Sequence, residues 1–204
     1  MDRLIAGYHR FRQSRWPERK ATYESLAEHG QAPRALVLAC SDSRVDPTMI
    51  FDAAPGELFI VRNIANLVPP YQPDARWHGT SAALEFGVRV LQVPDLIVMG
   101  HAMCGGINAL LNGVPPECGD FLASWIKIAE PAKRRVLQCA PADPLTAAEH
   151  EAVKLSLENL LSFPWIAERV QSGKLTLHGA MYGIRSGELS LLGDDGAFHA
   201  VPTA

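Results

Sequence analysis

The sequence has no long basic run, no long apolar run and few cysteines. Its 19 Lys and Arg against 22 Asp and Glu give a net charge of −3 and a pI near 6.2. The electrostatic footprint of a protein that binds nucleic acid or an anionic membrane is therefore missing. No apolar run approaches the roughly 20 residues that a membrane span needs, and the first twelve residues lack the apolar core of a signal peptide. We expect a cytoplasmic protein that acts on a small molecule.

The four cysteines of this 204-residue chain indicate metal binding or catalysis rather than disulfides. No internal repeat, low-complexity segment or long linker divides the chain, so we expect a single domain over residues 1–204. Residues 1–29 are expected to form a helical arm at its start. That expectation depends on apolar residues at helical spacing, which are Leu4, Ile5, Tyr8 and Phe11.

Two short apolar runs, 35–39 and 96–99, each lead directly into reactive side chains. The first run reaches Cys40, and the second reaches His101 and Cys104. Short apolar runs without polar alternation are typical of buried parallel strands, and the working site of an open α/β sheet lies outside the carboxyl ends of such strands. The two runs therefore predict that these three side chains meet at one edge of a sheet.

Further patterns complete the expected fold, which is an α/β fold with a mainly parallel central sheet of four to five strands, flanking helices and an N-terminal helical arm. A capping-box pattern at Thr146 and Glu149 predicts a helix whose apolar face serves only for packing. The remaining strand patterns cover 58–61, 174–178 and 188–192, and helix patterns cover 79–91 and 105–111.

Cys40, His101 and Cys104 together offer two thiolates and one imidazole, the ligand count of a catalytic zinc site with an open fourth position. A lone cysteine beside an apolar run is more often a packing residue. Three donors at strand ends nevertheless favour a metal, and the helix expected after Cys104 would lower the pKa of its thiol. Cys118 and Cys139 lie outside this pattern and are expected to be free thiols.

Asp42 and Arg44 follow the first of these donors. A carboxylate two residues from a ligand can reach the surroundings of the metal, and a guanidinium beside it keeps it ionised. The alternative is an ordinary ion pair in a turn, which contributes little.

The segments 40–45 (Cys-Ser-Asp-Ser-Arg-Val) and 100–106 (Gly-His-x-x-Cys-Gly-Gly) resemble the two signatures of the β-class carbonic anhydrases. Segments 55–66, 79–86 and 173–179 also resemble that family, in the expected order. The resemblance implies a zinc lyase that reversibly hydrates carbon dioxide to bicarbonate and a proton. One Zn²⁺ per chain, held by the three donors above, would lower the pKa of a bound water and supply hydroxide near neutral pH.

The same resemblance implies roles for other residues. Asp42 would accept the proton of the zinc-bound hydroxide in a hydrogen bond, and Arg44 would orient Asp42. The family also forms homodimers or homotetramers in which N-terminal helices pack across a dimer. The positions at which the family lines its substrate pocket are Gln31, Phe59, Ile64 and Phe86 in this chain.

One branch of the resembled family closes its site by ligating the aspartate at lower pH, and it binds bicarbonate in a second pocket built from a tryptophan, an arginine and a tyrosine. This chain keeps Arg62 and Tyr182 but has Val37 at the tryptophan position. A valine offers no N–H donor to an anion. We therefore expect an open site, with water rather than Asp42 on the metal across neutral pH.

Two alternatives remain open from the sequence. A relative of this fold could hydrolyse carbon disulfide or carbonyl sulfide with the same zinc. A non-catalytic zinc module would instead close the site with a fourth protein ligand, for which the candidates are His78, His178 and Cys118.

Overall fold

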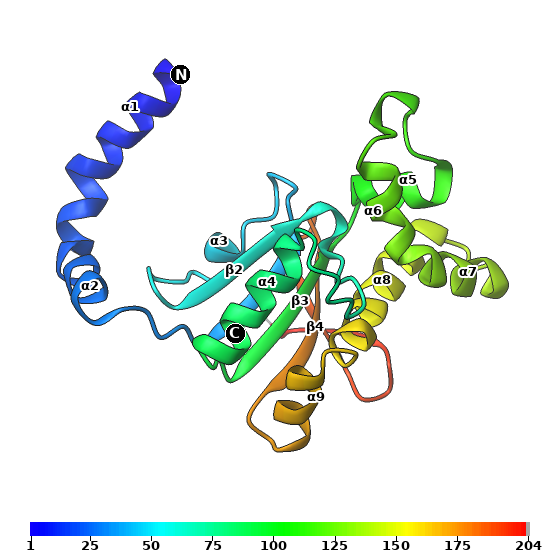
Figure 1. Ribbon diagram of the computed structural model, residues 1–204. Coiled ribbons are helices and arrows are strands. Elements are labelled where there is room, and N and C mark those ends of the chain that lie inside the picture. The colour runs from blue at the N-terminus through cyan, green and yellow to red at the C-terminus, as the bar shows by residue number, and fades with distance from the viewer. Residues whose placement is uncertain (203–204) are drawn as a thin grey trace.

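A six-stranded sheet organises the computed structural model, which describes residues 1–202 (Figure 1). Its four parallel strands are followed by two antiparallel ones. In spatial order the strands are β2 (Leu58–Asn63), β1 (Ala35–Cys40), β3 (Asp95–His101), β4 (Thr176–Tyr182), β5 (Leu189–Leu192) and β6 (Phe198–Ala200). The predicted α/β fold with a mainly parallel sheet is confirmed. The sheet has one strand more than expected, because three-residue β6 is too short to leave a pattern in the sequence. The predicted single domain reaches residues 203–204, which lie outside the described residues.

The central strand β1 is buried along its whole length, because apolar side chains pack against both of its faces. Leu36 and Leu38 belong to a core cluster with helices on one face, whereas Val37 and Ala39 belong to a cluster on the other face. Neither face of β1 meets water, which explains why its sequence shows no polar alternation.

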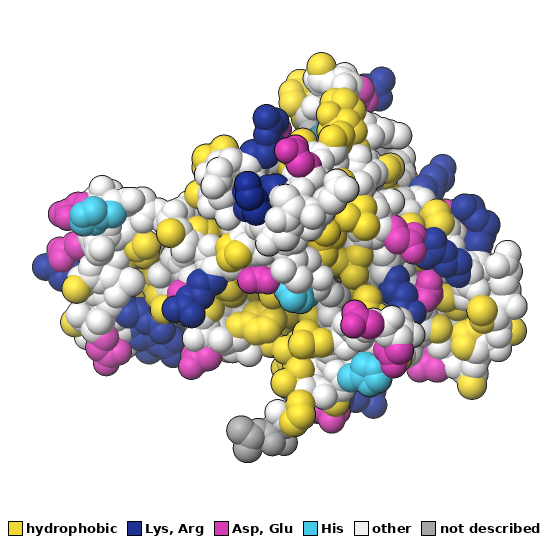
Figure 2. Space-filling model, turned by 90° about the horizontal axis from the view of Figure 1, so that it is seen from below, with side chains coloured by type: hydrophobic (Ala, Val, Ile, Leu, Met, Phe, Trp, Pro, Cys, Tyr) yellow, Lys and Arg dark blue, Asp and Glu magenta, His cyan; other side chains and the backbone are white. Residues whose placement is uncertain are grey.

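The helices are α1 (Asp2–Arg10), α2 (Trp16–His29), α3 (Pro47–Ile50), α4 (Gly79–Glu85), α5 (Gly105–Asn112), α6 (Leu122–Ile126), α7 (Glu130–Cys139), α8 (Pro144–Leu160) and α9 (Pro164–Gln171). A π-helical segment, Phe11–Arg15, joins α1 to α2, and this arm stands away from the sheet (Figure 1). No residue of α1 or α2 is buried. Within residues 1–202, no helix is both long and apolar enough to cross a membrane. On the face drawn in Figure 2, acidic and basic side chains are interspersed.

Helix α8 begins differently from the sequence prediction. Asp143 is its N-cap, with a side-chain oxygen that accepts a hydrogen bond from the Thr146 amide at 3.1 Å, and Pro144 occupies the first turn. An extended aspartate followed by proline is a strong helix start, so the helix begins before Thr146. The predicted capping box is therefore wrong. Glu149 lies in the second turn of the helix, on its buried face, and is only 3% exposed.

Candidate metal centre

Three donor side chains meet at the carboxyl edge of the parallel sheet. Cys40 ends β1 and His101 ends the neighbouring strand β3, and the parallel register that pairs Ala39 with Met99 brings these ends together. Cys104 is the N-cap of α5, immediately after β3. The ligand atoms of Cys40, His101 and Cys104 all lie within 4.8 Å of one another, and all three residues are buried. The structure therefore brings together the three donors that the sequence singled out.

The imidazole of His101 is held in an orientation that leaves one ring nitrogen free to bind a metal. Its Nδ1 lies 2.9 Å from the carbonyl oxygen of Ala102, which can only accept, so Nδ1 carries the proton. Nε2 is then an unprotonated acceptor, and it is buried without a hydrogen-bond partner. A second hydrogen bond that fixes the tautomer and leaves one nitrogen free is the usual arrangement of a metal-binding histidine.

The contact between the two sulfurs shifts the pKa values of Cys40 and Cys104 in opposite directions. A hydrogen bond from Cys104 is the main cause that lowers the pKa of Cys40, to about 4, against the opposing effect of burial. The nearby imidazole of His101 and then the amides of Asp42 and Ala65 lower it further. The same contact, together with burial, raises the pKa of Cys104, although the first amides of α5 oppose this. The contact thus favours a thiolate at Cys40 and a proton on Cys104. Two sulfurs and one imidazole nitrogen fit zinc, and a dication would displace that proton.

Asp42 and Arg44 form a more specific contact than an ordinary turn ion pair. The Arg44 amide and Nε both donate to Asp42 Oδ1 at 2.9 Å, and Arg44 Nη2 donates to Asp42 Oδ2 at 2.7 Å. These bonds hold the pKa of Asp42 well below its usual range. Arg44 Nη2 also lies 3.3 Å from the Met103 carbonyl oxygen, which ties the Cys40 loop to the Cys104 loop. Asp42 does not belong to the group of donor atoms, but its ionised carboxylate lies close enough for its charge to act on His101.

Loop 63–68, which follows β2, forms one wall of the centre. The Asn63 side chain bridges the loop, because its Nδ2 donates to the Leu67 carbonyl at 2.8 Å and its Oδ1 accepts from the Leu67 amide at 2.9 Å. Ala65 has a positive φ of 63° inside this loop. Gly106 packs against the loop so closely that a Cβ there would lie 2.8 Å from Cγ2 of Ile64. The second glycine of the His101 motif is therefore required by this close approach.

The Arg62 side chain holds the Cys40 loop by hydrogen bonds to its backbone carbonyls. Its Nε donates to the Cys40 carbonyl at 2.9 Å, and its Nη2 donates to the carbonyls of Asp42 at 2.6 Å and Val45 at 2.8 Å. Val37 lies fully buried in β1. Nε and Nη2 of Arg62 are thus directed to backbone carbonyls, and Nη1 lies 4.0 Å from Asp46. The incomplete bicarbonate pocket stays a prediction from the sequence.

Sequence reasoning missed the roles of two polar residues on the buried face of α8. Glu149 Oε1 accepts a hydrogen bond from the Cys104 amide at 2.8 Å. Burial raises the pKa of this carboxyl. Ser156, seven residues later, accepts from the Val68 amide at 3.2 Å and donates to the Asn66 carbonyl at 3.3 Å. The available signal was the spacing of seven, which places two polar side chains on the apolar face of one helix.

Only one of the four predicted pocket residues lies beside the donors of its own chain. Ile64 follows β2, on the wall described above, and is 42% exposed. Phe59 pairs with Leu36, four residues before Cys40, which places it about 13 Å along the strands from that ligand. Phe86 stacks on Phe59 with ring centroids 5.9 Å apart, and Gln31 precedes β1. These three residues lie toward the amino edge of the sheet.

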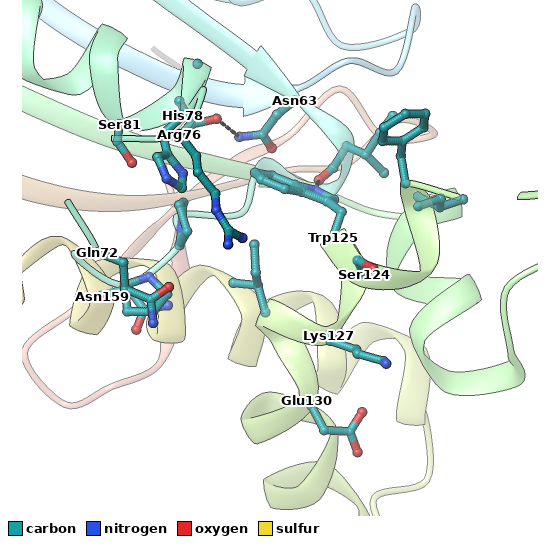
Figure 3. A pocket seen from close by; sticks show the side chains of 18 of the residues that line it. Asn63, Gln72, Arg76, His78, Ser81, Ser124, Trp125, Lys127, Glu130 and Asn159 are labelled. Atoms are coloured by element: carbon teal, nitrogen blue, oxygen red, sulfur yellow. Dashed lines mark hydrogen bonds between the residues drawn. The ribbon is translucent and has the colours of Figure 1, made fainter. Parts of the chain in front are cut away.

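A groove of about 1220 Å³ opens next to loop 63–68. Asn63 and Ile64 belong both to this loop and to the lining of the groove. Figure 3 shows Arg76 and His78 on one wall and Trp125 and Lys127 on the other. The indole of Trp125 donates to the Ile64 carbonyl at 2.8 Å, so this wall also holds the loop.

Comparisons with known proteins agree with this geometry. The family model described as carbonic anhydrase matches residues 35–189. The chain belongs to this family. Beta carbonic anhydrase 3 of Arabidopsis thaliana is 41% identical over 198 residues, which cover 94% of this chain and 76% of that protein. The structure of the β-carbonic anhydrase CcaA is similar with a TM-score of 0.92 and 36% identity, covering 100% of this chain and 92% of that one. A tetrameric β-carbonic anhydrase of Sordaria macrospora gives a TM-score of 0.82 at 27% identity, covering 94% of this chain and 96% of that one.

The family membership confirms the resemblance to β-class carbonic anhydrases, the zinc cofactor and the hydration of carbon dioxide. It also weighs against a closed, non-catalytic zinc module. Within residues 1–202, no fourth His, Cys, Asp or Glu joins the donor group. Two of the candidates have other partners, since His78 Nε2 lies 2.6 Å from Asp74 and His178 Nε2 lies 2.8 Å from Asp95.

Proposed function

We propose that Cys40, His101 and Cys104 hold the zinc with which this carbonic anhydrase reversibly hydrates carbon dioxide to bicarbonate and a proton. The observation that carries the assignment is the buried group of three donor atoms, in which the Nε2 atom of His101 has no other partner. Zinc in such a site lowers the pKa of water and so supplies hydroxide near neutral pH.

Asp42 and Arg44 act beside that group. A carboxylate oxygen has two acceptor sites in its plane. Oδ1 of Asp42 uses both for the Arg44 amide and Nε, whereas Oδ2 accepts only one bond from Arg44 and keeps a free acceptor site. Asp42 can therefore accept a hydrogen bond from the attacking oxygen and direct a lone pair of that oxygen at the carbon. Arg44 fixes the carboxylate plane and keeps it ionised, so that the contribution of the pair is orientation.

We propose that a second copy of the chain completes the substrate pocket. Ile64 lies beside the donors of its own chain, whereas Gln31, Phe59 and Phe86 lie too far along the strands to reach them. A homodimer or homotetramer would bring these residues to a partner's site. The exposed arm supports association, because apolar Leu4 is 72% exposed in the single chain. A cytoplasmic location stays a prediction from the sequence.

Zinc content and stopped-flow carbon dioxide hydration, measured on the same preparation, test the proposal. We expect one zinc per chain in the wild-type protein. Cys104→Ala should lose zinc, and its hydration rate should fall to the same extent as its zinc content. Exposed Cys139 provides a matched control, and Cys139→Ala should keep both zinc and rate. Full zinc content in Cys104→Ala would refute the ligand assignment. Release of sulfide from carbon disulfide, without carbon dioxide hydration, would instead support the sulfur-substrate alternative.

A further inference from the structure

The buried face of α8 carries a carboxylate for which the reaction provides no role. Glu149 is 3% exposed, and its Oε1 accepts a hydrogen bond from the Cys104 amide at 2.8 Å. Its Oε2 is buried and has no hydrogen-bond partner among the described residues. Burying a carboxylate with one oxygen unpartnered is unfavourable. An apolar side chain would serve packing better, so the position requires another explanation.

The hydrogen bond of Glu149 acts on the backbone turn that separates two metal donors. Met103 has a positive φ of 60°, a conformation that non-glycine residues adopt only when the surroundings hold them in it. Cys104 comes next and is the N-cap of α5, although its side chain makes no capping hydrogen bond. The direction of the Cys104 side chain therefore depends on the orientation of the Met103–Cys104 peptide plane, and Glu149 binds the N–H of that plane.

We propose that Glu149 is a positioning residue, which holds the Cys104 amide and thereby places the Cys104 sulfur for zinc binding. The inference rests on the proposed role of Cys104 as a zinc ligand. Ser156, on the same helix face, holds a second backbone segment in a similar way. Its hydroxyl accepts a hydrogen bond from the Val68 amide and donates one to the Asn66 carbonyl, both in loop 63–68. Helix α8 thus anchors both backbone segments around the centre by side chains seven residues apart.

Two conservative variants separate the reach of this side chain from its charge. Glu149→Asp keeps the charge but is one methylene too short to bond the Cys104 amide from the same backbone position. Glu149→Gln keeps the length and an acceptor oxygen but loses the charge. If Glu149 acts by position, Gln should bind zinc almost as tightly as wild type. Asp should bind it about 10–100-fold more weakly, the usual effect of losing a residue that supports a metal ligand.

The readouts are the zinc dissociation constant from chelator competition and the absorption spectrum of the cobalt(II)-loaded protein. The spectrum reports the geometry of the sulfur ligands, which a purely structural role would leave unchanged. Glu151→Asp and Glu151→Gln are matched controls, because Glu151 lies on the same helix but its half-buried carboxylate pairs with Lys154 at 3.0 Å and Arg135 at 3.6 Å rather than with the Cys104 loop. Both controls should behave as wild type.

Wild-type zinc affinity and an unchanged cobalt spectrum in Glu149→Asp would overturn the inference. An equal loss of affinity in Glu149→Gln would also overturn it, in favour of a charge effect. Circular dichroism of the metal-free proteins shows whether each variant folds. If the Asp variant does not fold, a shifted cobalt spectrum in folded Glu149→Gln overturns the inference, and an unshifted one supports it. Wild-type protein that binds no zinc would refute the proposed ligands themselves.

Discussion

Replacing Arg44 by alanine should slow carbon dioxide hydration strongly while leaving zinc in place. The substitution removes two charge-assisted hydrogen bonds to Asp42, at 2.9 and 2.7 Å, and the contact with the Met103 carbonyl. Asp42 then loses its fixed orientation but stays near the centre, and loss of such an orienting partner typically costs about 10–100-fold in rate. The side chain of Arg44 is 47% exposed, so its removal should change the free energy of unfolding by no more than about 1 kcal/mol.

The pH dependence shows whether orientation or charge is lost. Arg44 holds the pKa of Asp42 below its usual range, so its removal lets that pKa rise toward the ordinary value of about 3.9. Asp42 therefore stays ionised at pH 7 in the variant. The rate should be lower across pH 6–9 without a new ionisation in that range.

Stopped-flow hydration and zinc content should be measured for Arg44→Ala, Arg44→Lys and the control Arg89→Ala. Arg89 makes a comparable exposed ion pair with Glu85 at 2.7 Å, far from the donors in the fold. Lysine keeps the charge but not the forked geometry, so Arg44→Lys should recover only part of the rate. Wild-type turnover in Arg44→Ala would reduce the pair to a structural turn, and full recovery by lysine would show that charge alone matters.

Further predictions concern the metal, the fold and pH. Cys104→Ala should lose zinc and part of the stability that zinc confers, whereas Cys118→Ala should keep both, as atomic absorption and thermal unfolding with and without chelator will show. Gly106→Ala should lower the free energy of unfolding by about 1–3 kcal/mol in urea titrations, because the new Cβ would lie 2.8 Å from a methyl carbon of Ile64; an unchanged midpoint would refute this crowding. Acid should remove the stabilising contribution of Asp42. Since its folded pKa is depressed, that contribution is complete above the unfolded pKa of about 3.9 and is lost as pH falls toward the folded pKa, so Asp42→Asn should show a weaker loss of stability in this window. Hydration should rise with pH as a single titration, with an alkaline bias because two thiolates neutralise the zinc charge; a profile that requires two or more coupled protons would contradict the open site.

The three donors could be predicted from the sequence because the pattern of apolar residues shows where strands end. Apolar runs that stop at Cys40 and at His101 predict strand ends, and parallel strands bring such ends to one edge. The bond between Arg44 and Asp42 was also predictable, since it spans only two residues. Local spacing and strand direction were sufficient for these features.

Features that depend on distant contacts could not be predicted in this way. The sequence pattern assigns Glu149 to a capping box, and only the packing of α8 against the Cys104 loop shows why this carboxylate is buried. Phe59 and Phe86 occupy positions at which the family lines its substrate pocket. The register that pairs Phe59 with Leu36 places them away from the donors of their own chain. A single sequence does not show which residues a second copy would supply.

Zinc K-edge X-ray absorption of the wild-type protein near pH 7 tests the central claim most directly. Cys40, His101 and Cys104 as ligands predict two sulfur atoms at about 2.3 Å from zinc and two nitrogen or oxygen atoms at about 2.0–2.2 Å. A shell with no sulfur or a single sulfur would contradict the assignment of both cysteines, and a shell of three sulfurs would contradict an open fourth position.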